Sequence, residues 1–426
     1  MSGTFGRIGT FAIASALPLG VAFAQTMPAT QAPPVAVPAP PIAAEAPPPA
    51  PVLPPPLWDA RDALQLLSFI RGVGAEGLEP LDYDPDGLQK ALASASPVAI
   101  SAAANDRFNR LASDLALGHV RGDDRQGWLI KDPDLENGRL DQLLRSAVAR
   151  HDVAGTLMGL LPTHPQYGAL KTALSITPRT ETAKYQRIRL NLDRWRWLPR
   201  DLGDRYIIVN VPAYTAALVE NGTTVSRHHA VAGKISTPTP QLSAIATGVI
   251  LNPWWELPKS IEKEVRGKKG YVAVKDDNGK IIRYRQPPGP SNALGKVKFV
   301  MPNPEAIYLH DTNARSKFNS RVRAFSHGCI RTEHIMDLAT LLLTEGSDEW
   351  TPEKVQATLA SGKTVQAKFP KPLPVYIVYM SSAAHVDGHI VDYADVYKRD
   401  GKVIEALLDG KKGGVEKPAD KQVAAK

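Results

Sequence analysis

Apolar residues recur at three- and four-residue spacing from Trp58 to about Leu174, a pattern typical of amphipathic helices. Leu64, Leu67 and Ile70 form one such stripe, and Asn105-Asp106 is a start signal for a later helix. Short Gly- and Pro-containing loops separate the helical stretches. The pattern predicts an α-helical domain.

The next segment, 184–205, is the most basic of the chain and is interleaved with tryptophan. Ile188, Leu192 and Trp195 fall on one helical stripe, and Pro199 ends it. Most arginines lie off that stripe, so we expect a packing helix with a solvated cationic face. Stacking on single-stranded nucleic acid is the weaker interpretation. The helical scaffold domain is therefore predicted to span residues 58–203.

After Gly203 the apolar residues recur at every second position, the spacing typical of β-strands. Asn221-Gly222 and Asn278-Gly279 are hairpin turn signals between apolar runs. Helices are expected at 335–344 and 352–360. The sequence thus predicts an α+β protein in which a mostly antiparallel β domain, 204–400, precedes a flexible tail, 401–426.

The N-terminal segment has the features of a secretory signal. Arg7 precedes an apolar run, and Ala22-Phe23-Ala24 forms an Ala-x-Ala cleavage site. The run is shorter than the ~20 residues of a membrane-spanning helix. We expect a signal peptide at residues 1–24, export to the periplasm of a Gram-negative envelope, and no stable membrane span after cleavage. The alternative is an uncleaved N-terminal anchor.

Composition narrows the partners and the chemistry. Many of the 37 prolines lie in a Pro/Ala-rich stretch, 25–57, that reads as a linker. The net charge of +8 points to an anionic partner, and export favours a cell-envelope polymer over nucleic acid. A single cysteine excludes an intrachain disulfide and any zinc site of several thiolates. His119, His151 and His164 lack metal-ligand spacing, so no metal is expected.

The one cysteine lies in Ser326-His327-Gly328-Cys329-Ile330-Arg331. We expect a helix to begin near Thr332, so that its dipole and the flanking cations favour the thiolate. The amides of Gly328 and Cys329 are candidate oxyanion donors. His310, which precedes Asp311 nineteen positions upstream of the cysteine, is a candidate general base. A buried, inert thiol is the competing interpretation.

The run from Ile307 to Arg331 resembles the signature of YkuD-type L,D-transpeptidases. Further stretches resemble the large YcbB-like branch of that family: Trp195 to Pro199, Tyr206 to Pro212, Gly233-Lys234, Asn252 to Trp255, Arg285 to Asn292 and Pro374 to Met380. The resemblance implies a β-sandwich for the catalytic domain. The sequence departs from the branch in two features: it lacks the peptidoglycan-binding module, and its capping insertion is reduced to a short hairpin, 256–285.

The resemblance implies acyl transfer on peptidoglycan stems without a cofactor. Cys329 would attack residue three of a tetrapeptide stem, and His310, oriented near Asp311, would carry the proton. His327 is the weaker base candidate and Gly328 shapes the turn. The expected substrate-binding residues are Arg331, Tyr308, Gln286, Asn292, Trp254 and Trp255. For the two tryptophans, core packing is an equal alternative.

Several outcomes stay open at this level. The acceptor is a stem amine. The short cap leaves the acceptor side more open, which predicts entry of the α-amino group of residue one and a 1→3 cross-link, with the ordinary 3→3 link as an equal alternative. Water as acceptor would make the protein an L,D-carboxypeptidase instead, and an inert cysteine would make it a wall-binding scaffold. Carbapenems are expected to acylate Cys329.

Overall fold

The computed structural model describes residues 54–131, 139–384 and 389–409. The expected signal peptide, the linker up to residue 53 and the tail from residue 410 lie outside the described residues. Among the helices that are described, none is long and apolar enough to cross a membrane.

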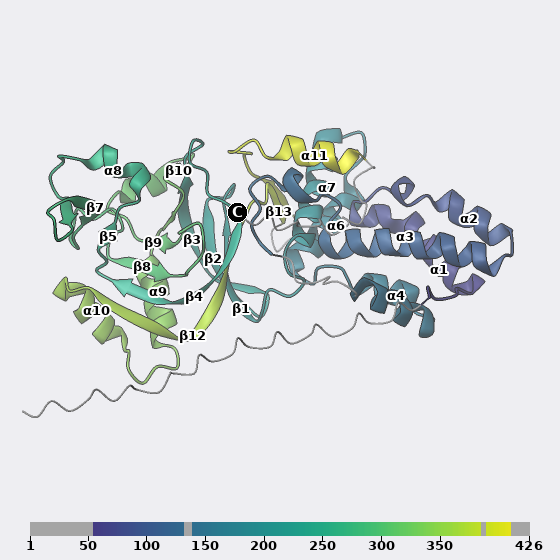
Figure 1. Ribbon diagram of the computed structural model, residues 1–426, viewed down its shortest axis with the longest axis horizontal. Coiled ribbons are helices and arrows are strands. Elements are labelled where there is room, and N and C mark those ends of the chain that lie inside the picture. Colours follow the sequence, from purple (N-terminus) through teal and green to yellow (C-terminus); the bar gives the residue numbers. More distant parts are fainter. Residues whose placement is uncertain (1–53, 132–138, 385–388, 410–426) are drawn as a thin grey trace, which may run out of the picture. The chain divides into compact units, whose positions relative to one another are not determined.

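The N-terminal part is helical, as the periodicity predicts (Figure 1). Its α-helices are α1 (Ala60–Gly72), α2 (Pro85–Ala93), α3 (Pro97–Leu117), α4 (Arg139–Ala149), α5 (Val153–Met158), α6 (Pro165–Ile176) and α7 (Thr182–Arg196). Short 3-10 turns are η1 (Val73–Glu76), η2 (Pro80–Tyr83) and η3 (Gly122–Arg125). Asp59 and Ser96 cap α1 and α3, each accepting a backbone N–H three residues on.

Helix α3 begins earlier than the sequence indicated. It is capped by Ser96, has Pro97 in its first turn and runs through Asn105-Asp106 without a break. The expected start at Asn105-Asp106 is therefore wrong. The Asn105 side chain instead accepts a hydrogen bond from the Trp58 indole at 2.7 Å, so tertiary contact uses the polar group that looked like a cap.

Helix α7 buries the predicted apolar stripe, but its arginines do not form a solvated face. Arg194 and Arg196 are each 1% exposed. Arg196 Nη1 lies 3.1 Å from Asp193 Oδ1, and Arg194 Nη1 lies 2.8 Å from Asp400 Oδ1. The prediction of a cationic surface is wrong because other segments cover this side of α7, with one carboxylate supplied by Asp400 of α11 and the other by Asp193 of α7 itself.

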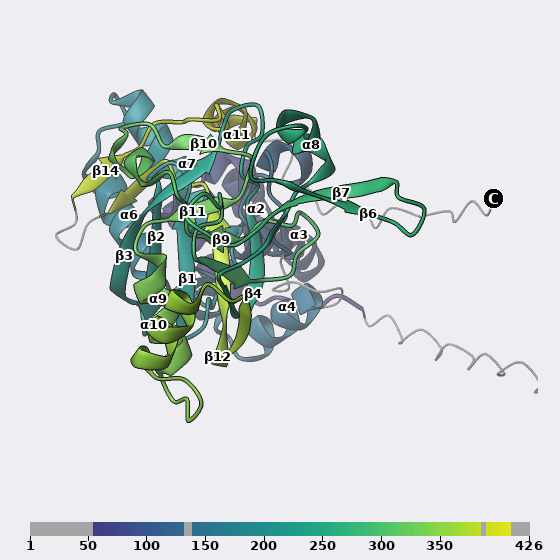
Figure 2. The same cartoon turned by 90° about the vertical axis from the view of Figure 1, so that its left-hand side faces the viewer.

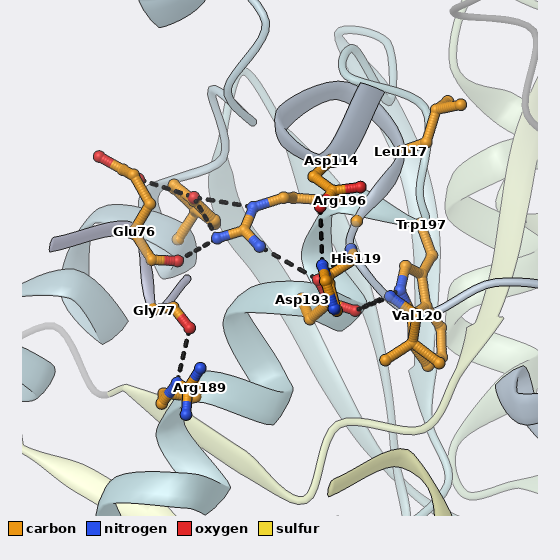
Figure 3. Close-up of polar contacts among 12 residues, drawn as sticks. Glu76, Gly77, Asp114, Leu117, His119, Val120, Arg189, Asp193, Arg196 and Trp197 are labelled. Atoms are coloured by element: carbon orange, nitrogen blue, oxygen red, sulfur yellow. Dashed lines mark hydrogen bonds and ion pairs between the residues drawn. The ribbon is translucent and has the colours of Figure 1, made fainter. Parts of the chain in front are cut away.

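Asp193 is the centre of this buried network (Figure 3). Its carboxylate accepts the backbone N–H of His119 at 2.6 Å and of Val120 at 3.1 Å, and the indole N–H of Trp197 at 2.9 Å. Burial alone would raise the pKa of Asp193, but Arg196 and these donors outweigh it and hold the pKa below its usual value. Every charge here has a partner.

The β-rich part is a closed, mixed sheet and not the expected sandwich (Figure 1). Strand β3 pairs with both β2 and β11, so the order β3-β11-β9-β8-β4-β12-β1-β2 returns to its start, and β10 pairs with β3 in addition. The strands are β1 (Arg205–Asn210), β2 (Thr215–Glu220), β3 (Thr223–Gly233), β4 (Leu242–Leu251), β8 (Val297–Val300), β9 (Leu309–His310), β10 (Ala324–Ser326), β11 (Ile330–Thr332) and β12 (Val365–Val378). The α+β class holds, with the sheet closed as a barrel.

Local signals predicted several elements of this part correctly. The Asn221-Gly222 turn joins β2 to β3. Helix α9 (Ile335–Thr344) and helix α10 (Pro352–Ser361) occur where expected, and Thr351 caps α10 by accepting from the Lys354 amide. Helix α9 buries its apolar side in the same core as Val297, Phe299 and the neighbouring strands. One 3-10 turn, η4, spans Arg315–Asn319.

A small cap interrupts the barrel between β4 and β8. It contains β5 (Trp255–Glu256), α8 (Lys259–Val265), β6 (Val272–Lys275) and β7 (Ile281–Gln286), with the strands in the order β5-β7-β6. The predicted hairpin at Asn278-Gly279 is present, and Figure 2 shows it projecting away from the barrel. Helix α8 and strand β5 were not anticipated, so the cap is more than a hairpin.

The segment after the barrel folds back as a strap. It comprises β13 (Ser382–Ala384), β14 (Ile390–Asp392) and α11 (Asp400–Leu408). Helix α11 buries Val403 and Leu407 in a cluster with Leu190 and Trp197 of the α7 region. The prediction of a flexible tail is therefore wrong for residues 401–408, because their apolar side packs against the scaffold.

Candidate functional site

Three neighbouring strands bring the chemical groups onto one face of the sheet. His310 of β9 is in register with Lys298 of β8 on one side and with Arg331 of β11 on the other. Cys329 and Tyr308 each lie directly before one of these strands, and the Ile330 N–H donates to the Tyr308 carbonyl at 3.0 Å, so the two residues are brought side by side. The alternate residues, among them Leu309 and Ile330, point into the barrel core.

The turn before Cys329 is fixed by two hydroxyl groups. Ser326 Oγ donates to the Cys329 carbonyl at 2.6 Å and accepts the Gly328 N–H at 3.1 Å. Thr239 Oγ1 donates to the Gly328 carbonyl at 2.7 Å. Gly328 has a φ of +123°, which an L side chain rarely adopts. Because the Gly328 amide is already bonded to Ser326, the Cys329 amide is left as the candidate oxyanion donor.

Cys329 does not lie at a helix N-terminus. It precedes strand β11, and α9 begins only at Ile335, so the expected dipole effect is absent. Burial raises the pKa of the thiol, and hydrogen bonds from the Tyr308 N–H and hydroxyl, with the charges of Lys298 and Arg331, offset this only in part. The resting group is a half-buried thiol with cations nearby.

His310 is deeply buried and neutral. Burial, the Arg331 guanidinium and the Lys298 ammonium together lower its pKa to about 3. Its Nδ1 atom is buried and has no hydrogen-bond partner among the described residues. A neutral imidazole on the strand next to Cys329 has the protonation state that a general base needs.

The Asp311 carboxylate serves the fold of the neighbouring turn. It accepts the Lys296 N–H at 2.9 Å and lies 2.9 Å from Arg315 Nη2. A Cβ on Gly295 would collide with it, so this turn closes tightly around the carboxylate. Asp311 therefore anchors the end of β9, which carries His310, from the β8 side.

His327 points to the cap. Its Nε2 atom lies 3.2 Å from Lys234 Nζ and 3.5 Å from Glu264 Oε1 on α8. These contacts place it in the wall between the nucleophile turn and the cap, whereas the Cys329 thiol donates to the Ala306 carbonyl at 3.7 Å.

Gln286 and Asn292 are placed beside the site, but their amides are occupied by backbone. Gln286 accepts the Ala293 N–H and donates to the Ser291 carbonyl, both at 2.9 Å. Asn292 donates to the Pro253 and Pro287 carbonyls at 2.9 and 2.8 Å. This supports a structural role for both residues in the loop that joins the cap to β8.

The two tryptophans differ in their contacts. Trp255 packs on the cap cluster that contains Leu257 and Ile261, and its side chain partly offsets the burial that raises the pKa of the Tyr308 hydroxyl. Trp254 lies under Arg285, whose Cζ is 4.2 Å from the ring centre. Trp255 therefore links the cap to Tyr308, beside the turn that carries the thiol.

Sequence reasoning missed three residues of this region. Lys298 alternates with Val297 and Phe299 in an apolar run, and that alternation was the available signal. Thr239 and Tyr397 carried none: Tyr397 donates to the Gly233 carbonyl at 2.6 Å and accepts the Thr239 N–H at 3.2 Å, a contact across more than 150 residues.

One group outside this face has metal-like spacing. Asp59, Asp62 and His151 place ligand atoms within 4.8 Å of one another. His151 Nδ1 already lies 2.9 Å from Asp62 Oδ2, and Asp59 caps α1. The histidine and the two carboxylates satisfy one another.

A thiol, an imidazole on the adjacent strand and flanking donors form the set of groups used in acyl transfer through a nucleophile. Residues 204–367 match the model of the L,D-transpeptidase catalytic domain, YkuD, and residues 54–174 match a scaffold domain. The chain thus carries a YkuD-type L,D-transpeptidase catalytic domain behind a scaffold domain.

A curated relative agrees with this assignment. A Haemophilus influenzae protein named "Putative L,D-transpeptidase" is 29% identical over 304 residues, which are 65% of this chain and 58% of that protein. The chain therefore spans less than two thirds of the relative's length.

Solved structures with weaker similarity carry the same family name. An L,D-transpeptidase from Mycobacterium smegmatis matches 41% of this chain and 58% of its own, at 14% identity and a TM-score of 0.22. The catalytic domain of the E. faecium L,D-transpeptidase acylated by ertapenem matches 42% of this chain and 99% of its own, at 17% identity and a TM-score of 0.19.

Proposed function

We propose that this chain is a peptidoglycan L,D-transpeptidase that uses Cys329 as a covalent nucleophile. The observation that carries the proposal is the placement of the half-buried thiol: it directly precedes strand β11, and neutral His310 stands on the adjacent strand β9 of a YkuD-type domain. We propose the periplasm as its place of action, from the N-terminal sequence.

The reaction begins with attack on the donor stem. Cys329 Sγ adds to the carbonyl carbon of stem residue three while His310 accepts the thiol proton. The Cys329 amide and the Tyr308 hydroxyl stabilise the oxyanion. The C–N bond to the terminal D-alanine then breaks, and His310 returns the proton to the leaving amine.

The acceptor completes the cycle. A stem amine attacks the thioester, forms the new amide and releases the thiol. The acceptor is the side-chain amine of residue three, giving a 3→3 link, or the α-amino group of residue one, giving a 1→3 link. Glu264 and Trp255 of the cap stand beside this face, so the cap helps to determine which amine enters.

The test uses purified protein and disaccharide-tetrapeptide. Intact-protein mass should show an acyl-enzyme, and tandem mass spectrometry of the dimers should locate the acceptor nitrogen. Cys329→Ala should fold but form neither product, and a carbapenem should add once to the wild type and not to this variant. Free D-alanine without dimers would instead identify an L,D-carboxypeptidase.

His310→Ala and His327→Ala form a matched pair, since both remove an imidazole close to Cys329. Loss of the positioned base should slow acylation by roughly 10²–10⁴-fold. Loss of His327, which contacts Lys234 and Glu264, should be milder. Cross-links made by Cys329→Ala, or a larger loss from His327→Ala than from His310→Ala, would contradict the proposal.

A further inference from the structure

Lys298 reaches the nucleophile face without an acidic partner. It extends from β8 on the side of His310, and its Nζ lies 4.0 Å from the centre of the Tyr308 ring. Tyr308 lies beside the turn that carries Cys329, because its carbonyl accepts the Ile330 N–H at 3.0 Å. Across the described residues, no carboxylate oxygen lies within 4.0 Å of Lys298 Nζ. Two acidic groups act on its charge, the Cys329 thiol and then the Glu256 carboxylate, and Glu256 pairs with Arg283 at 3.2 Å.

Arg331 stands on the other side of His310 and is also unpaired. Its Nε atom is buried and has no hydrogen-bond partner in the described part of the chain. Half-buried cations are costly unless an anion compensates them. Two such cations on either side of the base, with no carboxylate of the described residues paired to them, indicate a place where an external anion binds.

We propose that Lys298, with Arg331 opposite, binds the terminal α-carboxylate of the donor stem, so that a free carboxylate is the feature by which this site selects its donor. This rests on the proposed function. In a tetrapeptide stem, the carboxylate carbon is three bonds from the scissile carbonyl carbon. A cation against Tyr308, which lies beside the turn that carries the thiol, is therefore within reach of it.

Binding of the stem carboxylate to Lys298 and Arg331 would also make His310 a stronger base. Lys298 and Arg331 both lower the pKa of this imidazole while they are uncompensated. A bound carboxylate offsets their charges and so raises the pKa of His310 towards its usual range. The base thereby gains proton affinity when a correct donor is present.

The experiment compares a tetrapeptide stem that ends in a free carboxylate with the same stem ending in a carboxamide. Acylation rates of both are measured by intact-protein mass spectrometry. The wild type should prefer the acid by roughly 10- to 100-fold, the range expected for a hydrogen bond to a charged group. In Lys298→Met, the acid-to-amide ratio should fall towards one. Lys298→Arg, which keeps the charge, should restore much of the preference.

Lys296→Met is the matched control. It removes an exposed lysine two positions away and should keep the wild-type ratio, which excludes a general effect of net charge. An unchanged ratio in Lys298→Met, or equal rates for the two stems on the wild type, would overturn the inference and leave the proposed function intact. No acylation of the wild type by either stem would contradict the proposed function itself, and the inference with it.

Discussion

Arg196 in the scaffold and Arg331 in the barrel are both largely buried, yet their surroundings are opposite. Arg196 pairs with Asp193, donates to the Glu76 carbonyl and contacts the Tyr167 hydroxyl. Arg331 has a buried Nε without a partner, and Lys298 across His310 has no carboxylate within ion-pair distance in the described residues. The first arrangement is complete within the chain. The second is complete only with a ligand.

The contrast between Arg196 and Arg331 shows that a buried charge in this molecule has one of two roles, which depend on whether it has a partner. Where every charged group has a partner, as around Asp193 (Figure 3), removing one member leaves another uncompensated. Where the chain provides no partner, removing the cation relieves a cost of the free protein and harms only binding. Stability and catalysis should therefore respond in opposite ways to the same substitution at the two places.

The largest effect is expected for Arg196→Met. It leaves the Asp193 carboxylate buried without its guanidinium, so the free energy of unfolding should fall by about 3–5 kcal/mol. Denaturant unfolding measures this. Lys184→Met on the same helix, which breaks only the exposed pair with Glu181 at 3.5 Å, should change it by less than about 1 kcal/mol. Similar losses from the two variants would remove the basis of the comparison.

An intermediate effect on the stability of the folded protein is expected when the pH is lowered. Burial and the two cations lower the folded pKa of His310 to about 3, below the unfolded value of about 6.5. Between these values the unfolded chain binds the extra proton, so the stabilisation is complete above pH 6.5 and is lost as pH falls towards 3.

His310→Gln should make stability less dependent on pH, by up to about 1.4 kcal/mol per pH unit between pH 4 and 6. Urea unfolding at a series of pH values gives the slope. His164, stacked on Trp195 and lowered by burial to a pKa of about 4, provides a second histidine for comparison. If His310→Gln kept the wild-type slope, His310 would not be neutral in the folded protein.

The smallest effect on stability is expected for Arg331→Met, the same substitution as in the scaffold. Because no ion pair is broken, the free energy of unfolding should change by no more than about 1 kcal/mol or rise slightly. Acylation by the tetrapeptide should nevertheless slow clearly. A loss of stability as large as that of Arg196→Met would show that Arg331 has a structural partner after all.

Local patterns predicted those elements whose cause is local. The turn at Asn221-Gly222 and the cap of α10 by Thr351 follow from the conformations those residues favour. The burial of Arg196 could not be predicted in the same way, because Glu76 and Tyr167, which contact it besides its helix neighbour Asp193, come near only in the folded chain. The apolar spacing correctly predicted helix α7 but did not indicate which segments cover it.

The candidate site also contains residues that the sequence predicted and others that it did not. Cys329 and His310 stood out by residue type and motif. The three-residue strand β11 did not, since its pairing with β3 and β9 is set by distant residues, and this misled the expectation of a helix near Thr332. Gln286 and Asn292 are buried by loop contacts that a motif does not reveal.

The strap gives the order of synthesis a physical consequence. Tyr397 bonds to Gly233 and Thr239, Thr239 holds the Gly328 carbonyl, and Arg399 contacts the Thr239 carbonyl. These contacts come from residues 397–399, which follow every strand of the barrel in the sequence. The turn that positions the thiol is therefore finished only after synthesis has passed the strap, and chains truncated before residue 397 carry Cys329 in an unfinished setting.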